Sequence, residues 1–113
     1  MTAISLNATE KAAFVLESPL TVVEGESITY SVTYLGITTC SSPTALVYRN
    51  GSNDVTSTVM PSGSHSAAGN VVTLKPATGM VGNANYVIAV TCTADGNTRV
   101  KKIKLIVQKD EKP

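Results

Sequence analysis

Hydrophobic and polar residues alternate with a period of two along several short stretches of this chain. The clearest stretch is 27–35, in which every second residue is apolar: Ile28, Tyr30, Val32 and Tyr34. A period of two places successive side chains on opposite faces of a strand, so this stretch predicts a strand with one buried face. No segment keeps a helical period over two turns, and the pattern therefore predicts an all-β chain.

Two alternating stretches near the end of the chain flank the pair Asp95-Gly96. An Asp-Gly pair in this position is a strong hairpin signal. A loop centred on the pair sets Ile88 opposite Ile103, and a register shifted by one residue would set Ile88 against a lysine and mix the two faces. The sequence therefore predicts a hairpin of 84–94 and 98–107 in the first of these registers.

Turn-forming residues divide the rest of the chain into further short strands. Pro19, the pair Asn50-Gly51 and the small-residue stretch 61–70 each interrupt an apolar pattern. The expected strands are 14–23 (broken at Pro19), 27–35, 44–49, 54–60, 71–74, 84–94 and 98–107. Seven short strands bury two apolar faces by packing one sheet on another, so we expect an antiparallel β-sandwich, with a barrel as the alternative.

Length and composition agree with one domain. A chain of 113 residues, 42% of them hydrophobic, can bury a core without a metal or several disulfides. Charged residues make up only 15%, so Ser, Thr, Asn and Gly must supply much of the surface. We expect a flexible N-terminal arm over 1–13, the domain over 14–108 and a charged tail over 109–113.

Two segments resemble immunoglobulin-like domains of the bacterial and bacteriophage type. These are Val-Glu-Gly-Glu-Ser at 23–27 and Tyr-Val-Ile-Ala-Val-Thr at 86–91, which leads into Asp-Gly-Asn at 95–97. The second is similar to the penultimate strand of those domains, in which a Tyr is followed by alternating Val and Thr. The resemblance covers about residues 14–108 and implies a single seven-stranded antiparallel immunoglobulin-like β-sandwich. The core Trp and the inter-sheet cysteine pair of antibody domains are missing, so nothing about antigen recognition follows.

The resemblance also implies that the loops 36–43, 61–70 and 95–97 gather at one end of the sandwich. A group of loops at one end is a candidate partner-binding surface. The candidate residues in these loops are Thr38, Thr39, Ser41, Ser64, His65, Ser66, Asp95 and Asn97.

The two cysteines, Cys40 and Cys92, are too few for a disulfide scaffold and lack metal-ligand spacing. In the immunoglobulin-like template, strands 44–49 and 84–94 pair, which would bring the cysteines close enough for a disulfide. The alternative is one buried thiol and one loop thiol. We expect no catalytic cysteine, because the only histidine, His65, lies in a loop with no orienting partner evident.

The only basic cluster consists of Arg99, Lys101, Lys102 and Lys104. Alternation sends Lys102 and Lys104 to the outer face of the last strand and the other two toward the core side, unless a bulge turns them outward. Lysines on an exposed strand discourage edge-to-edge aggregation. The alternatives are a surface for an acidic partner and a nucleic-acid site, and the lack of interleaved aromatic residues disfavours the second.

Side chains that carry chemistry do not cluster along the chain. His65, interpreted as a solvated loop residue, has no nearby Cys, Asp or Glu with which to hold a metal. Glu24, Glu26, Asp54 and Asp95 lie in or beside turns, where acidic side chains form local hydrogen bonds. No motif for phosphate binding, nucleophile activation or paired carboxylates is present. We expect no metal, no cofactor and no catalytic residue, and we predict that the protein is not an enzyme.

The tyrosines carry two further expectations. Tyr86 would form a structural hydrogen bond of the tyrosine-corner kind. Alternation places Tyr30, Tyr34 and Tyr86 in the core, which leaves Tyr48 as a single stacking platform for a sugar. With no Trp in the chain, this weakens the interpretation as a carbohydrate-binding module.

Charge and hydropathy narrow the function further. A net charge of +1 gives no case for nucleic acid or for an anionic membrane surface, and no apolar run approaches the ~18 residues that span a bilayer. The first residues lack the basic and apolar regions of a secretory signal. We therefore expect neither nucleic-acid binding nor membrane insertion.

An immunoglobulin-like domain without an export signal is typical of a bacteriophage structural protein, made in the host cytoplasm and released in the virion. The resemblance implies a non-enzymatic adhesive module of a capsid or tail, in several symmetric copies that add avidity. Its partner would be the protein lattice of the particle or a host surface. The alternative is a repeat of a bacterial surface adhesin or an accessory module of a secreted glycoside hydrolase, which would be extracellular or on the cell surface.

Overall fold

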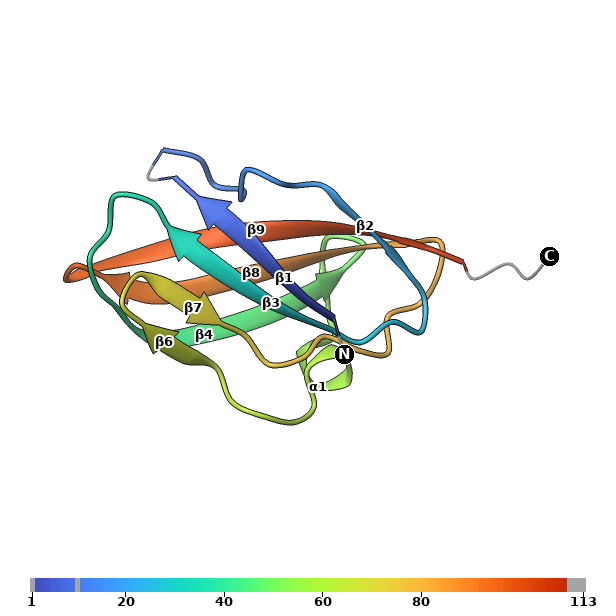
Figure 1. The fold of residues 1–113 in the computed structure, drawn as a ribbon. Coiled ribbons are helices and arrows are strands. Elements are labelled where there is room, and N and C mark those ends of the chain that lie inside the picture. Colours follow the sequence, from blue (N-terminus) through green and yellow to red (C-terminus); the bar gives the residue numbers. More distant parts are fainter. Residues whose placement is uncertain (1, 10, 110–113) are drawn as a thin grey trace.

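Two sheets pack against each other in the computed structural model, which describes residues 2–9 and 11–109 (Figure 1). One sheet has four strands in the order β1-β3-β7-β6, and the other has five in the order β2-β9-β8-β4-β5. The elements are β1 (Thr2–Ala8), β2 (Leu20–Val23), β3 (Ile28–Tyr34), β4 (Cys40–Arg49), β5 (Asn53–Asp54), α1 (Thr56–Val59), β6 (Ser66–Ala68), β7 (Val71–Thr73), β8 (Ala84–Ala94) and β9 (Asn97–Gln108).

The β8–β9 hairpin has the register that the sequence predicts. Ile88 faces Ile103 and Tyr86 faces Leu105 across the pair. Every second residue of both strands is buried along most of their length, so one face of the hairpin belongs to the core and the other is turned outward. The period of two and the Asp-Gly turn thus determine which side chains reach the core.

The core lies between the two sheets. Its most buried large side chains come from both layers, which ties the sheets together: Leu6, Tyr30, Val32 and Val72 from the four-stranded sheet and Val22, Val47, Tyr86, Ile88, Ile103 and Leu105 from the five-stranded sheet. Each fully buried side chain of this kind contributes about 1.5–3 kcal/mol relative to exposure. Loss of the contact between the sheets would therefore unfold the domain.

Residues 2–8 form a strand at the edge of the four-stranded sheet, where the sequence predicted an arm. β1 pairs with β3 in parallel and buries Leu6 and Ala8. The backbone N–H and side-chain amide of Asn7 both donate to the carboxylate of Glu17 at 2.8 Å, which fixes the following segment against the strand. Apolar residues at alternate positions 4, 6 and 8 carried the signal for this strand.

The predicted strand 54–60 is also wrong. Only Asn53–Asp54 pairs with β4, and the chain then turns into the single helical turn α1. The carboxylate of Asp54 accepts hydrogen bonds from the N–H and the hydroxyl of Thr56, and that hydroxyl accepts the N–H of Val47. These local bonds override the strand preference of the Thr- and Val-rich segment. A further strand, β6, lies at the edge of the four-stranded sheet, inside the predicted loop 61–70.

The predicted first strand, 14–23, is present only in part. Leu20–Val23 forms β2, which pairs in parallel with β9, and Phe14 forms a separate parallel bridge to Lys102. The other strands agree closely with prediction, except that β4 begins at Cys40 and has a bulge between Ser41 and Thr44. The described residues thus form nine strands with two parallel pairs. The two facing sheets agree with the expected sandwich, but the expected seven-stranded, wholly antiparallel arrangement is wrong.

Candidate functional site

The side of the five-stranded sheet that faces away from the core carries most of the exposed apolar surface. We call this side the outer face. Among the described residues, eight large hydrophobic side chains are exposed, and five of them lie on the outer face: Phe14, Val23, Leu46, Val100 and Ile106, with exposed fractions from 37% to 48%. A concentration of this kind on one sheet face marks a surface for binding.

The middle of the outer face has two adjoining hollows that share the ring of Phe14. One, of about 250 Å³, is lined by Phe14, Tyr48, Gly51, Val87, Ala89 and Lys102. The other, of about 290 Å³, is lined by Phe14, Ser18, Pro19 and Lys104. Each lining combines apolar side chains with one lysine, so the middle of the face can hold an apolar group next to a negative charge.

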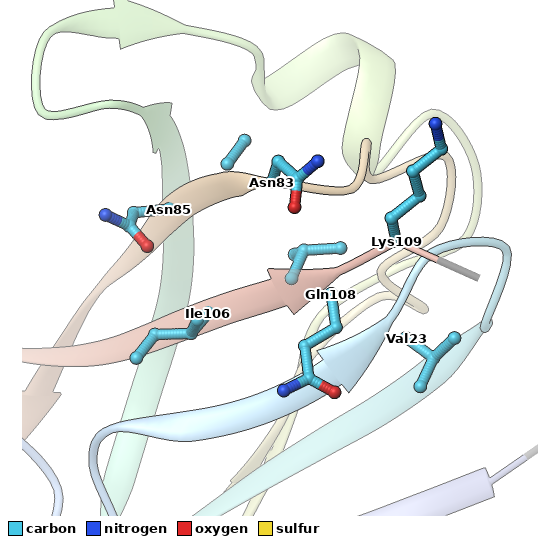
Figure 2. A pocket seen from close by; sticks show the side chains of 8 residues that line it. Val23, Asn83, Asn85, Ile106, Gln108 and Lys109 are labelled. Atoms are coloured by element: carbon cyan, nitrogen blue, oxygen red, sulfur yellow. The ribbon is translucent and has the colours of Figure 1, made fainter. Parts of the chain in front are cut away.

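A third hollow, open and of about 700 Å³, lies at the end of the outer face where β2, β8 and β9 meet (Figure 2). Its apolar lining comes from Val23, Ala84, Ile106 and Val107. The carboxamides of Asn83, Asn85 and Gln108 supply hydrogen-bond donors and acceptors. Across the strands Asn85 faces Ile106 and Gln108 faces Val23, so apolar and hydrogen-bonding side chains lie side by side, as in a protein interface.

The basic cluster predicted from the sequence is divided between two sides of β9. Lys102 and Lys104 are exposed on the outer face, as alternation predicts. Lys101 is buried, and its Nζ donates to the carbonyl of Ala12 at 2.9 Å, while Arg99 is half-buried. Of these four residues, only Lys102 and Lys104 are therefore accessible to a partner on the outer face.

Three of the predicted loop segments meet at one end of the molecule. The carboxylate of Asp95 accepts the backbone N–H of Thr38 at 3.0 Å and of Thr39 at 2.9 Å, and the N–H of Cys40 donates to the carbonyl of Gly69 at 2.7 Å. The bonds from Thr38 and Thr39 lower the pKa of Asp95. Asp95 thus holds two loops together, and a further role of this end in binding stays a prediction.

The rest of the loop 61–70 does not join that end. His65 precedes β6, at the opposite end of this short strand from Gly69. It lies in a loop, as the sequence predicts, but it is half-buried rather than solvated, and its Nδ1 accepts the backbone N–H of Lys75 at 3.1 Å. Burial and the charge of Lys75 lower the pKa of His65.

Both cysteines are buried free thiols. Cys40 faces Ala94 across β4 and β8, and Cys92 is the next inward-facing residue of β8, so the two cysteines are diagonal neighbours. Burial and the neighbouring Cys92 thiol raise the pKa of Cys40 to about 11. The interpretation of one as a loop thiol is wrong, because Cys40 begins β4 and is only 5% exposed.

Sequence reasoning found the outward lysines but missed the apolar part of the face. Val87 and Ala89 face outward on β8 between buried neighbours, so this strand is apolar on both sides. That double apolar pattern was the available signal, since a strand with one solvated side alternates with polar residues. Phe14 had no such signal, because its place depends on the bridge to Lys102.

Two further findings concern the described ranges 2–9 and 11–109. They contain no group of three or more His, Cys, Asp and Glu side chains arranged to hold a metal ion. Their helical segment is far too short to cross a bilayer.

Comparisons with known proteins add little to this geometry. No protein-family model and no curated protein matches the chain. Among solved structures, the chain is similar to the solution structure of amebosin, at 16% sequence identity and a TM-score of 0.38, over 96% of this chain and 99% of that one. The proposed function is therefore based on the fold and on the outer face.

Proposed function

We propose that this protein is a non-enzymatic structural and adhesive module that docks onto a protein surface through its outer face. One observation carries the proposal: five of the eight exposed large hydrophobic side chains of the described residues lie on this one sheet face. Apolar surface gathered on one face, interspersed with polar groups, is typical of a protein-binding surface.

The sequence resemblance supplies the setting that we propose for this surface. We infer an immunoglobulin-like domain of a bacteriophage particle, attached to the capsid or tail in several symmetric copies, with the virion as its location. Two features support the domain type: the two facing sheets, and the hydroxyl of Tyr86, which accepts the backbone N–H of Val81 at 2.9 Å as in a tyrosine corner. Repeated copies would give firm attachment from modest single contacts.

Electron microscopy of particles assembled with and without the protein tests the proposal. We expect regular density for the wild type and for Leu35→Asp, and reduced occupancy for Leu46→Asp. The two leucines are similarly exposed, at 41% and 47%, but only Leu46 lies on the outer face. Absent density on the particle, or equal occupancy of the two variants, would contradict the proposal. Hydrolysis of a common ester, peptide or glycoside substrate would contradict its non-enzymatic part.

A further inference from the structure

The outer face has a marked charge asymmetry over three neighbouring strands. None of the described outward residues of β2, β8 and β9 is acidic, and two of them are lysines. These outward residues are Thr21, Val23, Asn85, Val87, Ala89, Thr91, Thr93, Thr98, Val100, Lys102, Lys104, Ile106 and Gln108. Neither Lys102 nor Lys104 forms an ion pair with any residue in the described part of the chain. Within that part of the chain, their charges are therefore not engaged by an acidic side chain.

The one acidic residue that pairs into this sheet is already engaged. Asp54 lies opposite Tyr48 on β5, at the edge of the sheet. Its carboxylate accepts hydrogen bonds from the N–H of Thr56 at 3.0 Å and from the hydroxyl of Thr56 at 2.7 Å. It thus does not neutralise the two lysines through a direct contact.

The lysines stand at a defined spacing beside the apolar hollows. Lys102 and Lys104 are two residues apart on one strand, so their Cα atoms lie about 7 Å apart. Phe14 is beside Lys102 on one side, and on the other side Ala89 is opposite Lys102 and Val87 is opposite Lys104. An ion pair formed here would be partly shielded from water, and such pairs contribute more than fully exposed ones.

We propose that the outer face binds an acidic, extended segment of a partner protein, with two carboxylates at alternate positions paired to Lys102 and Lys104. An extended chain repeats its side-chain direction every second residue, so its alternate carboxylates have the same spacing as the two lysines. An apolar or aromatic side chain of the segment would contact Phe14 and Tyr48. This inference deepens the proposed function and rests on the docking role of the same face.

Charge favours a protein partner over a polyanion such as DNA. A nucleic acid is held by many phosphate contacts from a strongly basic surface. Here the net charge is +1, and the described outward residues of β2, β8 and β9 include only two cations, beside apolar side chains. Aromatic and apolar side chains next to a few charges are instead typical of the centre of a protein interface.

The test uses the full chain and a random copolymer of glutamate and tyrosine as the probe, with polyglutamate for comparison. We expect saturable copolymer binding that weakens with salt and shifts the amide NMR signals of the outer face. Lys102→Glu/Lys104→Glu should lower the affinity at least about tenfold. Lys75 follows β7 of the other sheet, so the control variant Lys75→Glu should change the copolymer affinity less than about twofold. Phe14→Ser should weaken copolymer binding more than polyglutamate binding.

The outcomes separate this inference from the proposed function. Absence of copolymer binding, an equal effect of Lys75→Glu, or tighter binding of double-stranded DNA or phosphatidylglycerol vesicles to the same face would overturn the acidic-segment proposal. If the acidic-segment proposal is overturned but Leu46→Asp still releases the protein from particles, the docking function stands without an acidic partner. Thermal unfolding of each variant identifies losses that come from misfolding, and the conservative Lys102→Gln/Lys104→Gln variant then repeats the test with a smaller charge change.

Discussion

Phe14 lies directly beside Lys102 in a parallel bridge between the N-terminal segment and β9. The N–H of Val15 donates to the carbonyl of Lys102 at 3.0 Å, and the N–H of Lys102 donates to the carbonyl of Ala13 at 2.7 Å. The bridge sends the side chain of Phe14 to the outer face and that of Val15 into the core. A segment with few strand contacts of its own thereby extends the apolar surface of the sheet.

Substitutions at these two neighbouring positions should differ in their effects on stability and on binding. Val15→Ala removes a side chain that is only 2% exposed and should lower the free energy of unfolding by about 1.5–3 kcal/mol. Phe14→Ala removes one that is 40% exposed and should cost less than about 1 kcal/mol, while weakening binding through the outer face. Urea denaturation measures both values, and a larger loss for Phe14→Ala would show that the bridge is oriented differently.

Tyr86→Phe should destabilise the domain by about 1–2 kcal/mol. The ring would remain in the core, but the buried phenol would no longer accept the N–H of Val81. Tyr48→Phe, at a half-exposed position of the outer face, is the control and should change stability by less than about 0.5 kcal/mol. Equal urea midpoints for Tyr86→Phe and the wild type would show that this hydrogen bond contributes no net stability.

The loop end of the molecule should lose stability in acid through Asp95. Its pKa is lowered in the folded protein by the hydrogen bonds from Thr38 and Thr39, so its contribution is present above the ordinary aspartate pKa of about 3.9 and is lost as the pH falls through the lower folded value. Asp95→Asn removes that contribution and keeps a residue that tolerates the positive φ of 46°.

The melting temperature of Asp95→Asn should therefore lie below that of the wild type at about pH 6, and the difference should shrink by about pH 2. Asp54→Asn serves as a comparison at another site, because hydrogen bonds from Thr56 lower the pKa of Asp54 in the same direction. A difference between Asp95→Asn and the wild type that is independent of pH would contradict the assignment.

Cys40 should react slowly with iodoacetamide in the native protein. Its thiol is buried and its pKa is raised to about 11, so at about pH 8 labelling should be at least about a hundredfold slower than after unfolding in guanidinium. Cys92→Ser leaves Cys40 as the only thiol and makes the rate specific. Rapid labelling of the native protein would contradict the burial of Cys40. A wild-type intact mass lower by the hydrogens of both thiols would show a disulfide instead.

The sequence predicted best what depends on local alternation and turn chemistry. The register of Ile88 and Ile103 follows from the period of two and the Asp-Gly turn, and the same alternation places Lys102 and Lys104 outward. The edge strands could not be placed in this way, because β1 pairs with β3 in parallel over a long sequence separation and local periodicity does not specify the partner.

The apolar part of the candidate site was missed for a related reason. Phe14 reaches the outer face only through its bridge to Lys102, and Leu46 joins it only through the pairing of β4 with β8. A surface assembled from three distant segments has no continuous signal in the sequence. The α1 turn was missed for a local reason. The hydrogen bonds of Asp54 and Thr56 outweigh the strand preference of the residues around them.

The parallel pairing of β2 with β9 determines when the domain can be completed during synthesis. Residues 20–23 emerge early from the ribosome, yet their hydrogen-bonding partners are residues 105–108. The nascent chain must therefore carry an unsatisfied early strand until residues 105–108 have been translated. Closure of the five-stranded sheet thus waits for β9, and until then the early segment is exposed to aggregation and to chaperones.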